Sequence, residues 1–222
     1  MSEDEYFDTG YHVDRYYELE EDLVKFLKFI SLELYDTPEK RMEVRSLYLA
    51  DLLIRIGSNI DVFFRKLIFS KYPEIEDERK ARASEKDCGK YKYKFLSFDD
   101  YKKLDEKFEC KRQHLSGSKV YEFQNKNFII PFDSWTEKTP SWWTSYNNVK
   151  HNADLEKANL DNVLQAMAAL FLLICFKKHS SKLIQYNYLC INPGHKGEIL
   201  SDRIIESHNP IVTKLFISPI ES

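Results

Sequence analysis

Apolar side chains recur every three or four positions along much of this chain. Over residues 11–35 such positions alternate with glutamate and lysine, and they are Leu19, Leu23, Phe26, Leu27, Ile30 and Leu34. This spacing predicts a helix with one buried face. The first ten residues are acidic and lack that pattern, so we expect a disordered tail over 1–10.

A second helix is predicted from residue 38 to about residue 70. Thr37 can cap its first turn, and Pro38 suits the first helical position. The apolar stripe that follows has the spacing of one buried helical face, and its members are Leu49, Leu52, Leu53, Ile56, Ile60, Phe63, Phe64, Leu67 and Ile68.

Three small or polar residues, Gly57, Ser58 and Asn59, interrupt that stripe. One interpretation is that the glycine lets another helix approach closely, because no side chain stands between the two backbones. The alternative is that Ser58 and Asn59 place polar groups in the interior, facing a site. The sequence leaves both open.

The middle of the chain, residues 73–131, begins with a highly charged segment and ends with two segments typical of β-strands. Residues 73–95 are highly charged and short of aliphatic side chains, which is typical of an exposed connection. Ser97 followed by Asp100 resembles a capping box and predicts a short helix to about residue 110. Two runs rich in β-branched and aromatic residues then flank Gln-Asn-Lys, which predicts a β-hairpin over 119–131.

Two more helices are predicted beyond the hairpin, over 140–152 and 156–179. The second is strongly apolar, but its core of 14 residues at 163–176 is shorter than the roughly 18 to 20 residues that span a bilayer. We interpret it as a buried core helix. Alternation at 183–191 and at 211–217 predicts strands in the last part of the chain.

The predicted fold is therefore mainly α. An antiparallel helical bundle occupies residues 11–180 and includes the charged connection and the hairpin. A β-rich extension follows over 181–222.

Composition narrows the class of protein. Hydrophobic residues make up 43% of the 222 residues, which is enough for a sizeable core and too much for a disordered chain. The net charge is −3, so any affinity for nucleic acid must come from a local basic patch. The acidic first residues lack the apolar segment of a secretory signal, so we expect a cytoplasmic protein that does not bind membranes.

The cysteines and histidines predict no cofactor and no metal. Combinations of Cys110 with His114, or of Cys190 with His195 and His208, match no spacing of a zinc module. The four cysteines are widely separated, and a disulfide framework would be unusual in a chain of this kind.

The densest group of candidate functional residues lies at 140–152, in the run PSWWTSYNNVKHN. On a helix, Asn147 and Asn148 share a face with His151, because they lie four and three positions before it. His151, Asn147 and Asn148 are thus the candidate catalytic residues. The candidate RNA-binding residues are Lys150, Tyr146, Trp143 and Arg55, since cations neutralise phosphates and aromatic rings stack on bases.

This run resembles bacterial members of the HEPN superfamily, a family of small helical bundles. The resemblance covers residues 130–175 and includes Phe132 and Trp135 before the run and Asn159 and Asn162 after it. It implies a homodimer, because catalytic members of that family are metal-independent ribonucleases whose cleft forms between two copies. It also implies a bacterial stress or defence setting, with RNA or a nucleotide and a cognate partner protein as further partners.

The resemblance places His151 at the family's signature histidine, as a general acid or base or as an orienting group for a 2′-hydroxyl. The family's arginine is missing: the three matching positions are occupied by Tyr146, Ser145 and Thr144. Lys150 cannot simply replace it, because neighbours on a helix point about 100° apart. A spatially close arginine, Arg55 or Arg45, is the remaining candidate.

Three interpretations of this segment therefore stay open. It is a structural surface whose amides and imidazole fasten the helix to a loop, a binding site without catalysis, or a ribonuclease site. Trp143 and Tyr146 have an equally plain structural interpretation as core or interface anchors. At the level of function, the alternatives are an RNA-interacting protein and a non-catalytic helical module for protein–protein interaction.

Overall fold

The computed structural model describes residues 3–30, 32–85, 96–105, 115–122, 127–175 and 215–217. The described part is mainly helical, which confirms the predicted fold class. Its longer helices are α1 (Glu3–Leu27), α3 (Leu47–Lys71), α4 (Pro73–Glu85), α6 (Ser141–Asn152) and α7 (Leu160–Cys175). In the described ranges no helix combines the length and the apolar character that crossing a membrane requires.

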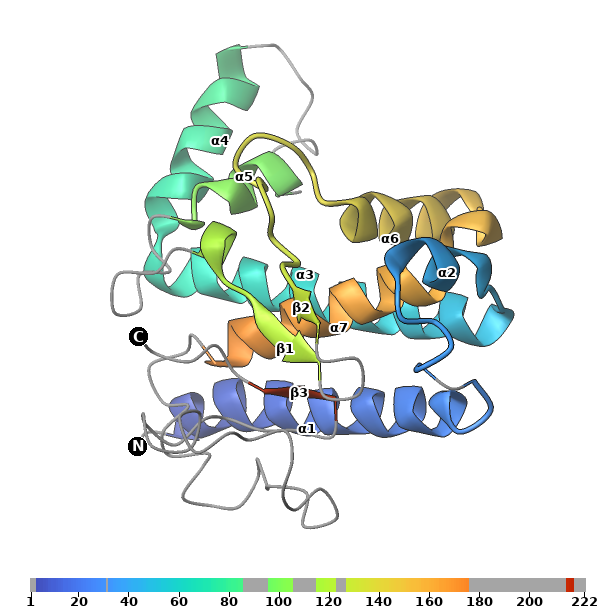
Figure 1. The fold of residues 1–222 in the computed structure, drawn as a ribbon. Helices are drawn as coiled ribbons and strands as arrows, with labels where there is room; N and C mark the ends of the chain where they lie inside the picture. The colour runs from blue at the N-terminus through green and yellow to red at the C-terminus, as the bar shows by residue number, and fades with distance from the viewer. Residues whose placement is uncertain are drawn as a thin grey trace.

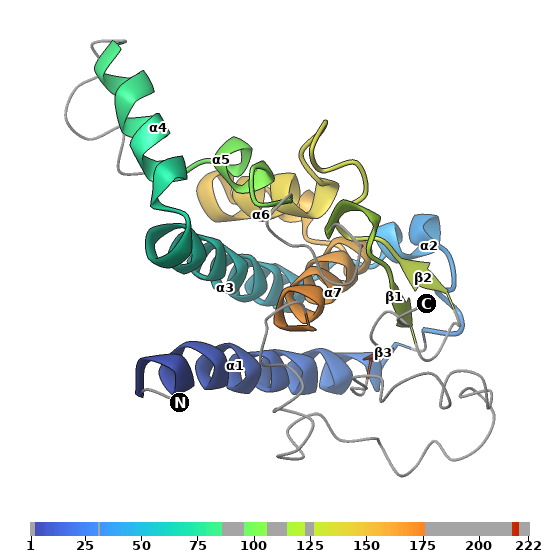
Figure 2. The same ribbon diagram turned by 90° about the vertical axis from the view of Figure 1, so that its left-hand side faces the viewer.

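Helix α7 lies at the centre of the fold and packs against α1, α2 (Pro38–Glu43), α3 and α6 (Figures 1 and 2). Every residue of α7 is buried apart from Gln165 and Cys175, which are half-buried. A helix that is apolar on all sides must be enclosed on all sides. The strongly apolar segment is therefore the core helix that its composition predicts.

Helix α1 departs from the prediction at both ends. It begins at Glu3, so the disordered tail expected over 1–10 is wrong for residues 3–10. Acidic residues in a first helical turn are favourable beside the partial positive charge of the helix start. At the other end α1 stops at Leu27, and Phe29 and Leu34 lie exposed in the following turns instead of continuing the buried stripe.

The single helix predicted over 38–70 is also wrong. The chain forms α2, an extended link at Val44 and Arg45, and then α3. The link is extended because Val44 O accepts a hydrogen bond from Leu160 N at 2.9 Å, at the start of α7. Ser46 then restarts the helix, since its Oγ accepts from Leu49 N at 3.1 Å.

The charged connection is helical where the structure describes it. Helix α4 spans Pro73–Glu85, and the short helix α5 spans Phe98–Lys102. The capping box at Ser97 is confirmed, because Asp100 Oδ2 accepts from Ser97 N at 2.8 Å. Helix α5 ends well before residue 110, the end that its sequence predicted.

The predicted hairpin is confirmed and belongs to a small sheet. Strand β1 (Val120–Glu122) pairs antiparallel with β2 (Phe128–Ile129) and with β3 (Phe216–Ile217). The order is β2-β1-β3, so the end of the segment predicted as a strand over 211–217 completes the sheet. The sheet covers one side of α7, where the rings of Phe171 and Phe216 lie 5.9 Å apart (Figures 1 and 2). The strand predicted at 183–191 lies outside the described residues.

Two short 3₁₀ turns, Leu115–Gly117 and Leu155–Lys157, precede β1 and α7. The second occupies the start of the helix predicted over 156–179, which begins at Leu160 instead. Asn159 sets that start, because its Oδ1 accepts a hydrogen bond from Asn162 N at 2.9 Å.

Candidate functional site

Helix α6 carries the candidate motif, and its aromatic face points into the core. Trp142 is buried, and its Nε1 donates to Pro131 O at 2.7 Å, across the turn that follows the hairpin. The same face packs on α3, where the ring of Tyr146 lies directly over Gly57. A Cβ atom at Gly57 would stand 2.4 Å from the Tyr146 ring, so the predicted close helix approach at this glycine is confirmed.

Trp143 and Tyr146 are core residues. Their exposures are only 6% and 1%. Trp143 packs against Phe98 and Tyr101, with ring centroids 5.1 and 5.8 Å away. Both rings therefore serve as packing anchors, as their alternative interpretation predicts, and in this structure they are not free to stack on RNA bases. Helical spacing beside Val149 places them on the buried stripe, which outweighs their suitability for stacking.

A short series of hydrogen bonds extends from the contact between α6 and α3. Tyr146 OH lies 3.3 Å from Ser58 Oγ and accepts a hydrogen bond from Lys150 Nζ at 2.8 Å. The Lys150 side chain thus extends back along α6 toward α3, and its ammonium group binds the Tyr146 hydroxyl. On the next position of α3, Asn59 Oδ1 lies 2.9 Å from His12 Nδ1 on α1. The polar groups after Gly57 thus point inward, where they bond to neighbouring helices. That they face a functional site stays a prediction.

His151 lies exposed on the last turn of α6. Within the described part of the chain it forms no hydrogen bond and no ion pair. The two amides are occupied elsewhere: Asn147 Nδ2 donates to Trp143 O at 3.1 Å, and Asn148 Oδ1 accepts from Asn152 Nδ2 at 3.5 Å. The three candidate catalytic residues therefore share the end of one helix, but no hydrogen bond connects them.

The helix ends directly after these residues. Ala153 adopts a left-handed conformation, with φ 52°, and its N–H is shared between Asn148 O and Val149 O. The break that the sequence indicates after Asn152 is thus made by backbone hydrogen bonds. Neither the His151 ring nor the side-chain amides cap it.

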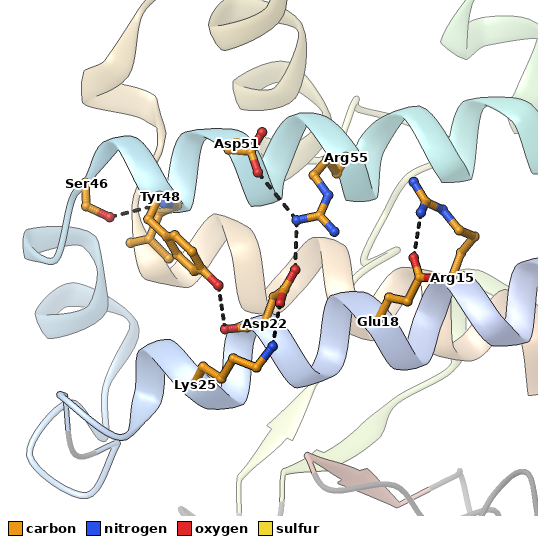
Figure 3. Close-up of polar contacts among 9 residues, drawn as sticks. Arg15, Glu18, Asp22, Lys25, Ser46, Tyr48, Asp51 and Arg55 are labelled. Atoms are coloured by element: carbon orange, nitrogen blue, oxygen red, sulfur yellow. Dashed lines mark hydrogen bonds and ion pairs between the residues drawn. The ribbon is translucent and has the colours of Figure 1, made fainter.

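Neither candidate arginine joins His151. The guanidinium of Arg55 lies 2.9 Å from Asp22 on α1 and 3.5 Å from Asp51, one turn earlier on α3 (Figure 3). That hydrogen bond from Arg55 holds the pKa of Asp22 below its ordinary value. Arg45 pairs with Glu156 at 2.9 Å. Arg55 therefore serves as a tie between α1 and α3, and the prediction that it contacts RNA finds no support in this arrangement.

The most unusual polar group of the described residues has no local signal in the sequence. Arg41 on α2 is buried and binds Glu122 of β1, with Nη2 and Oε2 2.7 Å apart. Its Nε donates to Tyr35 O at 2.8 Å. Asp161, in the first turn of α7, is buried beside this pair, and burial raises the pKa of its carboxyl to about 6.

Asp105 is another buried carboxylate, and both of its oxygen atoms accept hydrogen bonds. Asp105 accepts from Trp135 Nε1 at 2.8 Å and from Ser116 N and Oγ at 2.9 and 3.0 Å. Asp105 therefore holds the loop before the hairpin against the aromatic core.

In the described ranges no three histidine, cysteine or acidic side chains gather as metal ligands. The cysteine and histidine combinations considered from the sequence lie outside the described residues.

Comparisons with protein-family models, with curated proteins and with solved structures find no match.

Proposed function

We propose that this protein is a non-catalytic helical interaction module that associates with a second copy of itself. The observation that carries the proposal is a set of large apolar side chains exposed where α1 ends, α2 follows and α3 begins. We call this set the apolar end, and it consists of Phe29, Leu34, Met42, Leu47 and Tyr48. These elements meet at one end of the molecule (Figure 1).

The exposure at the apolar end is large. Phe29 is 89% exposed, Leu47 73% and Leu34 70%. Large apolar and aromatic side chains offer about 150–250 Å² each, so the five together expose on the order of 500 Å². One side of a standard interface covers about 800 Å², of which somewhat more than half is apolar. The apolar end therefore matches the apolar share of one side of a stable dimer.

The charges around the apolar end favour a copy of the same chain as its partner. Asp36 pairs with Lys40 at 2.7 Å, and Arg45 pairs with Glu156 at 2.9 Å. Positively and negatively charged side chains therefore lie next to each other around the apolar end. A twofold arrangement can exchange such pairs between copies, whereas a rim of one sign would select a partner of the opposite sign.

The site at α6 supports binding better than catalysis. A general acid or base is normally oriented by a second group, and His151 has no such partner within the described residues. Of the four residues predicted to contact RNA, Trp143 and Tyr146 are buried and Arg55 is engaged with Asp22. These observations move the balance from the nuclease hypothesis to the interaction module.

Light scattering coupled to gel filtration tests this function at micromolar concentration. We expect the wild-type chain to elute as a dimer and Phe29→Glu with Leu47→Glu to elute as a monomer. Phe69→Glu is the matched control, because Phe69 is half exposed near the other end of α3. A monomeric wild-type protein, or a dimer that only the control variant dissociates, would contradict the proposal.

A second candidate function remains, supported by the exposure of His151. The ring stands in solvent at the position of the family's signature histidine, with Lys150 beside it in the sequence. Incubation with total RNA, with and without chelator, tests it. Chelator-resistant cleavage that disappears in His151→Ala would establish a ribonuclease. Intact RNA together with no measurable RNA binding would leave the interaction module as the function.

A further inference from the structure

Three segments far apart in the sequence meet at the buried pair of Arg41 and Glu122. Arg41 comes from α2 and Glu122 from β1, while Asp161 belongs to the first turn of α7. All three side chains are more than nine-tenths buried. We call this group the Arg41 cluster. Its ion pair joins α2 to β1, and the charge of Asp161 interacts with both members of the pair.

The Arg41 cluster holds more acceptors than donors. One guanidinium faces two carboxylates, so the cluster carries a net charge of −1 when both acids are ionised. Two of its buried oxygen atoms have no hydrogen-bond partner among the described residues: Glu122 Oε1 and Asp161 Oδ1. A buried acceptor without a donor costs about 1–3 kcal/mol, and an uncompensated buried charge costs more.

A proton relieves both problems at once. It removes the excess charge and converts one carboxylate oxygen from an acceptor to a donor. The described residues around the cluster form no set of metal ligands. The proton is therefore the cation whose size and bonding fit the cluster.

The two acids differ in how they are held. Burial raises the pKa of Glu122 as well, but the nearby charge of Arg41 and its direct hydrogen bond favour the ionised form. Asp161 receives only the more distant attraction of Arg41, opposed by the charges of Glu122 and of Glu39 on α2. The start of α7 also favours a negative charge, by up to about 1 kcal/mol, but burial outweighs it. Asp161 is thus the acid that takes the proton.

We propose that the Arg41 cluster is a proton-binding lock, in which protonated Asp161 helps to hold β1 and α2 against α7. When the proton leaves, a second negative charge appears in the interior beside Glu122. The lock then weakens, and the contact between the sheet and the central helix loosens. The stability of the protein is therefore expected to change between mildly acidic and neutral pH through Asp161.

The sign of the response follows from proton linkage. Burial raises the pKa of Asp161 from 3.8 to about 6, so the folded chain binds this proton more tightly than the unfolded chain does. The stabilisation is fully present below the unfolded value and is lost as the pH rises through the folded one. For this group alone, the folding equilibrium constant falls about tenfold between pH 5 and pH 8.

Carbon NMR of the aspartate carboxyls tests the proton site directly on the wild-type chain. The Asp161 signal, identified from its absence in Asp161→Asn, should titrate near pH 6. A midpoint near 4 would overturn the proposal. Because this measurement uses the intact protein, it stays decisive even if a variant folds poorly.

Unfolding in urea at pH 5 and pH 8, at one protein concentration, tests the lock. The ratio of folding constants, wild type over Asp161→Asn, should fall about tenfold from pH 5 to pH 8. Asp14→Asn, at an exposed position of α1, is the matched control and should show a constant ratio. A constant ratio for Asp161→Asn as well would also overturn the proposal.

Glu122→Gln gives the opposite sign within the same cluster. It removes the partner of buried Arg41, so it should destabilise the protein at both pH values, whereas Asp161→Asn should stabilise it at pH 8. Hydrogen exchange at the Glu122 amide, bonded to Asn127 O at 2.8 Å, should show protection that falls from pH 5 to pH 8 in the wild type but not in Asp161→Asn. Equal behaviour of the two variants would contradict the division of roles between the acids.

Discussion

At the scale of single residues, Gly57 sets the distance between α3 and α6. The ring of Tyr146 occupies the space that a side chain would need, 2.4 Å from a Cβ atom at this position. Gly57→Ala would normally stabilise a helix by about 1 kcal/mol. Here we expect overpacking to dominate and to lower the free energy of unfolding by about 2 kcal/mol or more.

Chemical denaturation compares Gly57→Ala with Ser70→Ala, an exposed position of the same helix. The control should lie within about 0.5 kcal/mol of the wild type, as surface substitutions generally do. A stabilised Gly57→Ala variant would show that α6 can move away without cost.

Ala153 is the opposite case, because a glycine there should improve the protein. The left-handed conformation costs a residue with a Cβ atom about 1–2 kcal/mol, and glycine avoids most of this cost. We expect Ala153→Gly to raise the free energy of unfolding by about 1 kcal/mol. Ala81→Gly, at an exposed position in α4, should lower it instead. Two changes of the same sign in a thermal melt would argue against strain at Ala153.

At the scale of elements, the separation of α2 from α3 depends on Ser46. Its hydroxyl satisfies the Leu49 N–H at the start of α3. Ser46→Ala should lower the free energy of unfolding by about 1 kcal/mol, whereas Ser46→Asp should retain the cap. If urea denaturation finds both variants equally weakened, the cap is not the cause.

The tie between α1 and α3 should depend on pH with a sign opposite to that of Asp161. The hydrogen bond from Arg55 lowers the pKa of Asp22, so its stabilisation is present above about pH 4. It is lost as the pH falls through the folded pKa. Asp22→Asn should cost about 1 kcal/mol at pH 7 and almost nothing near pH 2. Urea unfolding at the two pH values checks this; an equal loss at both would assign the effect to packing.

Helical periodicity predicted those helices whose buried face is determined by their own side chains. Helix α7 is apolar all round, and α6 shows its buried stripe at Trp142, Trp143, Tyr146 and Val149. The break at Val44 was not predictable, because its cause is a hydrogen bond from Leu160. The cap at Ser97 was predicted correctly because it depends only on residues that are close to it in the sequence.

At the scale of the whole molecule, β3 joins the end of the described chain to the centre of the fold. Phe216 is fully buried against Phe171, and Leu215 N donates to Glu20 on α1 at 3.1 Å. Phe216→Ala should lower the free energy of unfolding by about 3 kcal/mol. The matched control is Phe128→Ala on β2, on the other side of β1, where the ring is half exposed.

A differential scanning experiment on both variants checks the role of β3. The control should shift the melting temperature much less than Phe216→Ala. Equal shifts would show that the sheet, and not the contact with α7, carries the stabilisation.

The candidate site was predictable only in part. The position of His151 on an exposed helix turn followed from the polar face of its segment. The burial of Trp143 and Tyr146 followed from their helical spacing beside Val149, which favours a core position over a stacking platform. The Arg41 cluster had no local signal at all, because Arg41 and Glu122 meet only when the sheet docks on α2.

The position of β3 in the sheet has a consequence for the order of events during synthesis. At 5–20 residues per second, the roughly 90 residues between Glu122 and its partner Phe216 take on the order of ten seconds to appear. For that time one edge of β1 lacks its neighbour, and unpaired edges recruit strands from other chains. A newly made molecule is therefore most exposed to misassembly just before its third strand emerges.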